Sequence, residues 1–332
     1  MKKIGIVIVN YHGWRDTLEC LESLKRVADP SFSIYVVDNG SRDESMQQLS
    51  NIQYQISNIK LLANDSNLGF AGGNNIGIKN AIEDGVDYIL LLNNDTIVPA
   101  DFLTKLLEAA ESDARIGIVG PKIYFWGSDK VTEGISDSVN GKNNSENNIY
   151  LNRSVTQQIW FGGGKLNWLR TRGSHVDYEK IEDYVDIPDT RYQIRDTDYI
   201  TGCCLLIKRE VIQEVGLMPE DYFLYYEDVD WCLKARQRGW RVVYVPAAHI
   251  WHKVSRSTGA GSASYVYYHV RNGMALSWRF GGLVRRTALL GFVGWTAAKQ
   301  VIKLCIPSKK AWAKAALKGC GDFLRWRMDR YT

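Results

Sequence analysis

The chain of 332 residues contains only six cysteines, and none of them forms a C-x-x-C pair. The absence of such pairs argues against a zinc site of the kind they build. The first apolar run, which follows Met-Lys-Lys, is only IGIVIV, and this is too short for the core of a secretory signal peptide. We therefore expect a cytoplasmic protein whose thiols are reduced.

Long apolar runs and nucleic-acid-binding motifs are also missing. The longest uncharged run of the C-terminal region, TALLGFVGWTAA at 287–298, has twelve residues, too few to span a bilayer. No recognised nucleic-acid-binding motif is present, so we expect no nucleic acid partner. Apolar content of 45% and charged content of 23% are ordinary for a globular protein, and the length suits one large domain with an appendage.

The charge is unevenly distributed along the chain. Residues 279–332 carry twelve Lys or Arg and two Asp, a local charge of +10, whereas the other residues carry 29 basic and 35 acidic side chains, a charge of −6. Trp295, Trp312 and Trp326 lie among these basic residues. A basic, Trp-containing amphipathic helix fits an anionic membrane surface. The alternatives are a helical pair packed on the core and a contact between two copies in a homodimer.

Short apolar runs rich in β-branched residues alternate with helical patterns. The strand-like runs lie at 4–10, 33–40, 59–64, 88–95 and 116–125, and the helical patterns lie at 18–27, 43–49, 75–83 and 102–110. This alternation predicts an α/β fold with a parallel, doubly wound sheet. Further along we expect an insertion with hairpins over 126–198, a strand running into a helix over 197–212, and a last core strand within 240–252.

Polar residues follow the first four of these strands. They are Asn10-Tyr11, Asp38-Asn39, Asn64-Asp65 and Asn93-Asn94-Asp95. Ligands of such sheets bind beyond the carboxyl ends of the strands, so aspartate at three of four ends points to one acidic pocket.

The last of these groups, in LLLNNDTIV, is a variant of the D-x-D pattern with which nucleotide-sugar transferases hold a divalent cation. A diphosphate and an acidic pocket repel each other unless a cation lies between them. An Asx turn that caps the next helix is the alternative interpretation.

Two loops offer candidates for binding phosphate or metal. GFAGGNN at 69–75 predicts a flexible turn entering a helix, and glycines there would let backbone amides approach a ligand. It lacks the G-x-G-x-x-G spacing of dinucleotide-binding loops, and a plain tight turn fits it equally well. In HIWHKVSRST at 249–258, His252 is the better metal candidate, and a nitrogen ligand favours Mn²⁺ over Mg²⁺.

The stretch FLYYEDVDWCLKARQRGW at 223–240 places Glu227, Asp228 and Asp230 within four consecutive positions, between aromatic residues. Acidic residues in the first turn of a helix are favoured by its dipole, which explains them without any reaction. A reactive site is the other interpretation.

The motifs together resemble the inverting glycosyltransferases of family 2, which have the GT-A fold, and among them the bacterial rhamnosyltransferase-like enzymes of surface-polysaccharide assembly. The likeness covers about residues 4–275. It rests on VIVNYHG, VVDNGSRDES, NLGFAGGNNIGI, LLLNNDT, DYITGCCLLIKREV, FLYYEDVDWCLKARQRGW, VPAAHIWHKVSRST and YYHVRN, in this order.

The resemblance implies a GT-A, Rossmann-like, doubly wound and mostly parallel sheet with a C-terminal helical, basic extension. The catalytic domain would occupy 1–275, with a nucleotide-binding half at about 1–125 and an acceptor half at about 126–275. The basic amphipathic tail would occupy 276–332.

The resemblance also implies roles for individual residues. Donor binding would fall to Asn10, Tyr11, Asp38, Asn67, Gly69, Gly72, Asn74, Asn93, Asn94 and Asp95. Asp95 and His252 would hold Mn²⁺ or Mg²⁺, and a phosphate loop would contain Lys253, Ser255, Arg256 and Ser257. Because this metal motif begins with Asn93 rather than Asp, Asp95 is left as the main anionic ligand.

Asp228 matches the catalytic base of the family, with Glu227 and Asp230 as supporting acids. Neighbouring carboxylates and partial burial would raise its pKa and make it a stronger base. Thr201, Gly202, Trp160 and Trp231 would shape the acceptor side.

The expected reaction is transfer of rhamnose from dTDP-rhamnose to a saccharide or lipid-linked saccharide, at the inner face of the plasma membrane. UDP-hexose and galactofuranose donors are alternatives. A nucleotidyltransferase would need a glycine-rich basic loop where this chain has NYHGWRD. A non-catalytic sugar- or nucleotide-binding protein is the second rival, and the presence of Asp95, Asp228 and His252 argues against it.

Overall fold

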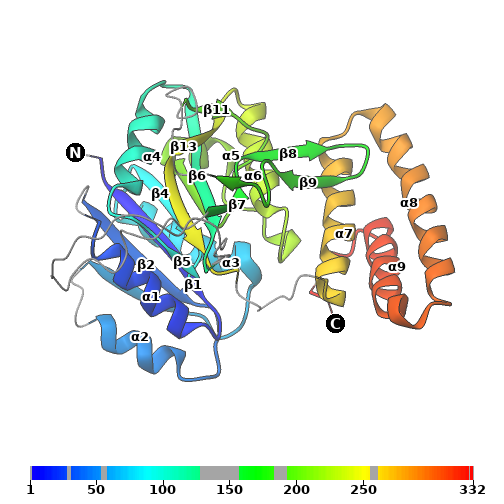
Figure 1. Ribbon diagram of the computed structural model, residues 1–332, viewed down its shortest axis with the longest axis horizontal. Helices are drawn as coiled ribbons and strands as arrows, with labels where there is room; N and C mark the ends of the chain where they lie inside the picture. The colour runs from blue at the N-terminus through cyan, green and yellow to red at the C-terminus, as the bar shows by residue number, and fades with distance from the viewer. Residues whose placement is uncertain are drawn as a thin grey trace, which may run out of the picture.

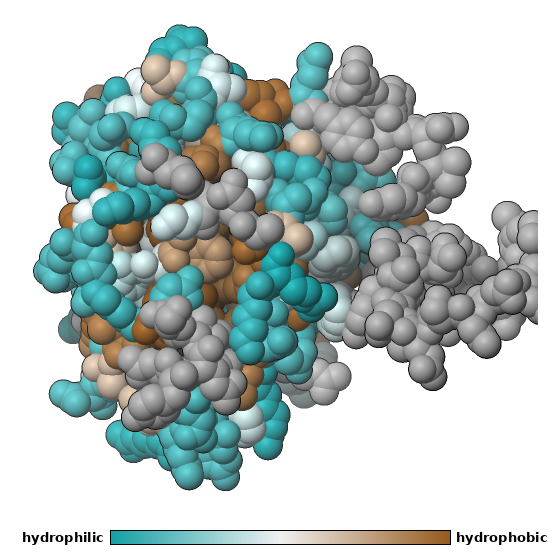
Figure 2. Space-filling model, turned by 90° about the vertical axis from the view of Figure 1, so that its left-hand side faces the viewer, coloured by the Kyte–Doolittle hydropathy of each residue, from teal (hydrophilic) through white to brown (hydrophobic). Residues whose placement is uncertain are grey.

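The computed structural model describes residues 2–27, 31–53, 58–127, 157–182, 193–254, 261–328 and 330–331. A twisted central sheet is flanked by helices, and a group of three helices extends to one side (Figure 1). The face at the left of Figure 1 carries mostly hydrophilic side chains, with hydrophobic ones gathered toward its centre (Figure 2).

The first half of the chain forms the parallel part of the sheet, in the strand order β4-β1-β2-β3. The strands are β1 (Ile4–Asn10), β2 (Phe32–Asp38), β3 (Ile59–Ala63) and β4 (Tyr88–Leu92), and the helices are α1 (Trp14–Leu24), α2 (Ser45–Gln53), α3 (Gly69–Glu83) and α4 (Phe102–Glu111). All five residues of β4 are buried, as expected of a central parallel strand. The predicted α/β, doubly wound architecture is confirmed.

The second half of the chain also adds antiparallel strands to the sheet. β12 (Cys204–Lys208) lies between β4 and β6 (Ile116–Phe125) and is antiparallel to both, while β13 (Arg241–His252) pairs with β6 in parallel and with the short β5 (Thr96–Ile97) in antiparallel fashion. Cys204 lies opposite Leu92, the last residue of β4. The turn that leads into β12 therefore meets the carboxyl end of β4, where the Asn-Asn-Asp motif begins.

The stretch at 69–75 does not form the flexible turn that its glycines predict, because α3 already begins at Gly69. The glycines of α3 let this helix lie close to the sheet. A Cβ on Gly77 would lie 2.4 Å from Val7 Cγ1, and one on Gly73 would lie 3.0 Å from Val9 Cγ1. Gly69 itself has a φ of +78°, a conformation that favours glycine.

The insertion contains short strands, including the hairpin of β8 and β9. The strands are β7 (Gln157–Phe161), β8 (Gly164–Asn167), β9 (Arg172–His175), β10 (Ile181–Glu182) and β11 (Arg195–Asp196). Two helices follow β12, namely α5 (Arg209–Val215) and α6 (Glu227–Gln237), with a 3-10 turn, η2 (Glu220–Tyr222), between them.

The extension consists of α7 (Ala263–Phe280), α8 (Leu283–Lys303) and α9 (Lys310–Leu324), with the 3-10 turn η4 (Pro307–Lys309) before α9. The three helices pack on one another, and α8 is the outermost of them (Figure 1). The predicted boundary at 275 falls inside α7. Among the described helices, none is both long and apolar enough to cross a membrane.

Candidate active site

The first wall of the site is built at the ends of β1 and β2. Asn10 and Asp38 are paired residues of these two strands, and both are buried. Asn10 Nδ2 donates to Asp38 Oδ1 at 2.7 Å, and Asn10 Oδ1 accepts from the Thr17 hydroxyl at 2.9 Å. The Ser41 amide donates to the second carboxylate oxygen of Asp38. This network fixes both predicted donor-binding side chains, whereas Tyr11 is exposed beside them.

Amide side chains join this wall to the start of α3. Asn39 Nδ2 donates to Asn67 Oδ1 and to the Gly69 carbonyl, and Asn67 Oδ1 also accepts from the Gly69 amide at 2.8 Å. Asn74 is buried and turns its amide back to the Phe70 carbonyl at 2.9 Å. A Cβ on Gly72 would meet Leu68 Cβ at 2.7 Å, so Gly72 also serves local packing.

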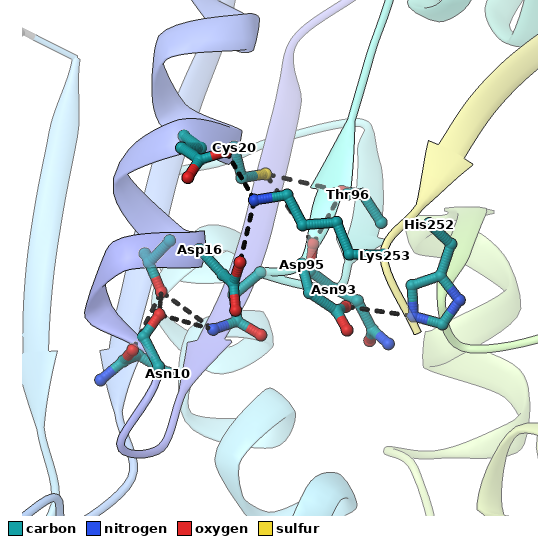
Figure 3. Close-up of polar contacts among 12 residues, drawn as sticks. Asn10, Asp16, Cys20, Asn93, Asp95, Thr96, His252 and Lys253 are labelled. Carbon is teal, nitrogen blue, oxygen red and sulfur yellow. Dashed lines mark hydrogen bonds and ion pairs between the residues drawn. The ribbon is translucent and has the colours of Figure 1, made fainter. Parts of the chain in front are cut away.

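The strand end after β4 carries the Asn-Asn-Asp motif into the same region. Asn94 Nδ2 donates to the Thr17 hydroxyl at 3.0 Å and so ties this motif to the first wall. Asp95 is buried and faces His252, with 3.1 Å between Asp95 Oδ1 and His252 Nε2 (Figure 3). Since β5 pairs His252 with Thr96, strand pairing itself brings these two predicted metal ligands together.

The donor atoms present fit a divalent cation. Asp95 supplies a carboxylate and His252 an imidazole, a mixed set that suits Mn²⁺. His252 Nδ1 is buried and has no hydrogen-bond partner among the residues the structure describes. Within that part of the chain no cluster of three or more His, Cys, Asp or Glu side chains is arranged to hold a metal. A cation here would therefore take its remaining ligands from phosphate oxygens and water.

Lys253 follows His252 and is held toward α1. Its amide donates to the Asp95 carbonyl at 2.9 Å, while its ammonium pairs with Asp16 Oδ1 at 2.9 Å and with Glu19 Oε2 at 2.6 Å (Figure 3). The other predicted phosphate-loop residues, Ser255, Arg256 and Ser257, lie outside the described residues.

The predicted base lies on the other side of the turn at 201–203. The Gly202 amide donates to Asp228 Oδ2 at 2.8 Å, and the Cys203 carbonyl accepts from the Asn93 amide at 2.9 Å. Burial and the nearby carboxylates of Asp95 and Asp228 raise the pKa of the Cys203 thiol well above its usual value. One short turn therefore lies within the field of both aspartates.

The three carboxylates of α6 have different surroundings. Asp228 is half-buried, and burial raises its pKa although the Gly202 and Val229 amides oppose the shift. Glu227 is buried, and burial together with the charge of Asp228 raises its pKa further. Asp230 is fully buried and pairs with Arg279 at 2.7 Å and Lys234 at 3.0 Å. Asp230 is thus part of an ion-pair network that joins α6 to α7.

A strained loop leads into α6. Phe223, Tyr225 and Tyr226 all have positive φ angles, between 63° and 77°. Such a conformation costs on the order of 1–3 kcal/mol for each non-glycine residue and persists only where the surroundings impose it.

Two residues of the YYHVRN motif in α7 impose this conformation. Asn272 Nδ2 lies 2.8 Å from the Leu224 carbonyl and 2.9 Å from the Tyr225 carbonyl, and Arg271 Nη2 donates to the Tyr222 carbonyl at 2.8 Å. Both side chains are fully buried. Their role was not predicted, although an Arg-Asn pair among aromatic residues of a helix is an unusual polar insertion.

The aromatic residues predicted for the acceptor side separate into two groups. Trp160 packs edge-on against His252, with 4.6 Å between ring centroids, and against His175, whose pKa burial lowers to about 4. The prediction for Trp231 is wrong. Trp231 lies on the side of α6 that faces the core, so its side chain is fully buried. Its indole N–H donates to the Gly216 carbonyl.

Gly202 and Thr201 lie at the turn beside Asp228. Thr201 is buried, and a Cβ on Gly202 would lie 2.8 Å from Phe70 Cε1 and 3.6 Å from Asp228 Cβ. The distance to Asp228 is an ordinary contact, but a side chain at position 202 would clash with the Phe70 ring, so glycine lets the turn pack against Phe70.

Comparisons with known proteins agree with this architecture. The family model described as glycosyl transferase family 2 matches residues 5–216. The N-acetylglucosaminyl-diphospho-decaprenol L-rhamnosyltransferase of Mycobacterium tuberculosis is 27% identical over 280 residues, which are 80% of this chain and 81% of that protein. The dTDP-rhamnosyl transferase RfbF of Shigella flexneri is 23% identical over 281 residues, which are 82% of this chain and 79% of that protein.

The fold is shared with a solved glycosyltransferase. The structure of GalNAc-T7 with UDP, GalNAc and Mn²⁺ matches with a TM-score of 0.61 at 16% identity, over 98% of this chain and 56% of that chain. The family model spans more than half of this chain, so the chain belongs to glycosyl transferase family 2. The resemblance to rhamnosyltransferase-like members and the GT-A-like fold class are confirmed.

Proposed function

We propose that this glycosyltransferase is inverting and cation-dependent, and that it transfers a sugar from a nucleotide-sugar donor to a hydroxyl group of a saccharide. The observation that carries the proposal is the turn at 201–203. It binds Asp228 through its Gly202 amide and the strand end of Asn93 through its Cys203 carbonyl, so that the base and the metal motif share one short support.

On the donor side, Asn10 and Asp38 would contact the base and ribose, because they are fixed at the ends of adjacent parallel strands. Asp95 and His252 would hold the cation. When bound, a divalent cation would neutralise the charge that develops on the leaving diphosphate. Lys253 would add positive charge there once the diphosphate competes with Asp16 and Glu19 for it.

On the acceptor side, Asp228 would take the proton from the attacking hydroxyl. A base is most effective when its pKa approaches the working pH while it stays ionised, and burial shifts the pKa of Asp228 in that direction. The Gly202 amide holds one oxygen of the carboxylate and so orients the carboxylate. Trp160 would offer an aromatic surface to a sugar ring.

The donor we favour is dTDP-rhamnose, since two relatives carry rhamnosyl transfer in their names. UDP-hexose and galactofuranose donors are the alternatives. Thermal shift with each sugar nucleotide, with and without Mn²⁺, tests the choice. A cation-dependent rise in melting temperature with dTDP-rhamnose alone supports it, and a rise with a UDP-sugar alone rejects it. We further propose a lipid-linked acceptor, presented at a membrane surface.

The mechanism is tested by Asp228→Asn, with Asp84→Asn as the matched control. Asp84 follows the last residue of α3, at the opposite end of this helix from Gly69, and pairs with Lys60. The general base contributes about 10²–10⁴-fold, so Asp228→Asn should lose transfer by that factor while it still binds the donor. Asp84→Asn should keep near-normal transfer. Near-normal turnover by Asp228→Asn would remove this residue from the role.

A further inference from the structure

The outer side of α8 is an apolar stripe that no described element covers. Residues spaced alternately four and three apart lie on one face of a helix. On α8 these residues, which we call the outer stripe, are Val284, Ala288, Gly291, Trp295, Ala298 and Ile302. All six are exposed and none is charged.

The exposure in this stripe is large for apolar side chains. Val284 is 81% exposed, Ile302 71% and Trp295 61%. The opposite side of the helix buries Leu289 and Val293 against its neighbours, so α8 is already anchored and its outer stripe is free for another contact. Figure 1 places α8 at the far end of the extension, on the side away from the face drawn in Figure 2.

One edge of the outer stripe is basic. At 100° per residue, Lys299 lies about 60° from the line through Val284 and Ile302, and Arg285 and Lys303 lie about 100° from it on the same side. The Lys299 ammonium lies 5.2 Å from the Trp295 ring centroid. Charge of one sign therefore borders the apolar side chains directly, within a region whose net charge is +10.

We propose that the outer stripe of α8 docks this enzyme on an anionic lipid bilayer, with α8 lying in the plane of the interface. Helices that bind in this way combine an apolar face with Trp and with basic residues at its border. A second copy of the chain is a poorer occupant, because it would bring another region of net charge +10 against this one. A helix of 21 residues would lie along about 30 Å of surface.

This docking would hold the catalytic domain beside lipid-linked acceptors, and in that respect it rests on the proposed function. Binding itself needs neither donor nor acceptor. The experiment can therefore fail while the transferase activity stands, and it can succeed if the proposed acceptor is wrong.

The test is co-sedimentation of the full chain with vesicles of phosphatidylcholine containing about one third phosphatidylglycerol, compared with pure phosphatidylcholine. We expect binding to the anionic vesicles that falls at least tenfold when NaCl is raised to about 0.5 M. Trp295→Glu and Ile302→Glu should each reduce binding about tenfold or more. Lys299→Glu reverses one charge at the border and should reduce binding more than fivefold.

The matched control is Ile181→Glu, which places the same charge on an exposed residue of β10, outside the extension. It should bind as the unchanged protein does, and all variants should keep their melting temperature and donor hydrolysis. Equal binding by Trp295→Glu, Ile302→Glu and the unchanged protein would overturn the proposal. So would a dimer in solution that Trp295→Glu converts to monomer, because the stripe would then be an interface between copies.

Discussion

The two sides of the site that we propose, the donor side and the base side, are built by different means. Asn10 and Asp38 end two regular parallel strands, and their side chains are satisfied by each other and by close neighbours. Asp228 instead follows a loop in which Phe223 and Tyr225 have positive φ angles, and that loop depends on Asn272, which lies 47 residues after Tyr225 in the chain.

The difference shows that the extension is not only an appendage. A sheet edge is supported by its own hydrogen-bond ladder, whereas a strained loop must be stabilised by contacts from elsewhere. Here α7 supplies them through Arg271, Asn272 and Arg279. Substitutions in the two regions should therefore have different signatures, with unfolding and slower turnover on the base side and weaker donor binding on the donor side.

The largest effect on stability is expected for Asp230→Ala. It leaves Arg279 without a fully buried partner and removes the acceptor of the Tyr222 hydroxyl. Breaking a buried pair by removing one partner costs about 3–5 kcal/mol of the free energy of unfolding. Urea unfolding measures this. Asp101→Ala, which removes an exposed pair with Lys105 on α4, is the control and should cost less than about 1 kcal/mol. A loss for Asp230→Ala no larger than that of the control would show that the buried network does not stabilise the fold.

The parts of the site that the sequence predicts well are those that follow from periodicity. Apolar runs locate β1 and β4, and polar residues at their ends then fall together because parallel strands share an edge. The meeting of Asp95 with His252 depends on an antiparallel pairing between β5 and β13 that no pattern in the sequence specifies. The motif resemblance supplied that pair instead.

The misses have physical causes of the same kind. Trp231 looks like a surface aromatic beside acidic residues, but the inner side of α6 is decided by its packing on the sheet. The glycines of α3 look like a turn, yet Gly73 and Gly77 are needed where the helix crosses β1 closely. The hydrogen bonds from Asn272 to the loop carbonyls depend on the positive φ angles of the loop. A sequence of aromatic residues does not predict these angles.

Asn272→Ala tests the support of this loop by α7, and we expect the second largest loss of stability from it. The substitution frees the Leu224 and Tyr225 carbonyls and lets the strained loop relax, at a cost of about 2–3 kcal/mol of stability. Turnover should fall about tenfold or more, since a small displacement of Asp228, the proposed base, is costly. The donor KM should change little, because Asn10 and Asp38 are untouched. A donor KM that rises as much as kcat falls would contradict a positioning role.

Asp38→Ala is the corresponding change on the donor side. It removes the acceptor of Asn10 Nδ2 and of the Ser41 amide, with a loss of about 1–3 kcal/mol of stability. The donor KM should rise about tenfold while kcat stays within a few-fold, because a binding contact of this kind contributes about 1.4 kcal/mol. Steady-state kinetics with varied donor measures both. Asp101→Ala, which removes only an exposed pair on α4, should change neither, and a fall in kcat alone for Asp38→Ala would place Asp38 in the chemistry.

Glu227→Gln should have the smallest effect on activity and distinguishes two adjacent carboxyl groups. Burial and the charge of Asp228 raise the pKa of Glu227 well above its usual value, so Glu227 retains its proton more readily than Asp228, and glutamine resembles its neutral form. If Asp228 is the base, as we propose, its raised pKa sets the acid limb of the pH profile of kcat/KM, and that limb should therefore stay close to its original position. Because the folded protein binds the Glu227 proton more tightly than the unfolded chain does, the stability due to this group is present below its unfolded pKa and is lost as pH rises through its folded pKa. Glu227→Gln should thus be more stable than the parent at high pH, by a margin that shrinks on acidification. Urea unfolding across that range measures the margin, and one that grows toward acid pH would mean that Glu227 is ionised in the folded protein.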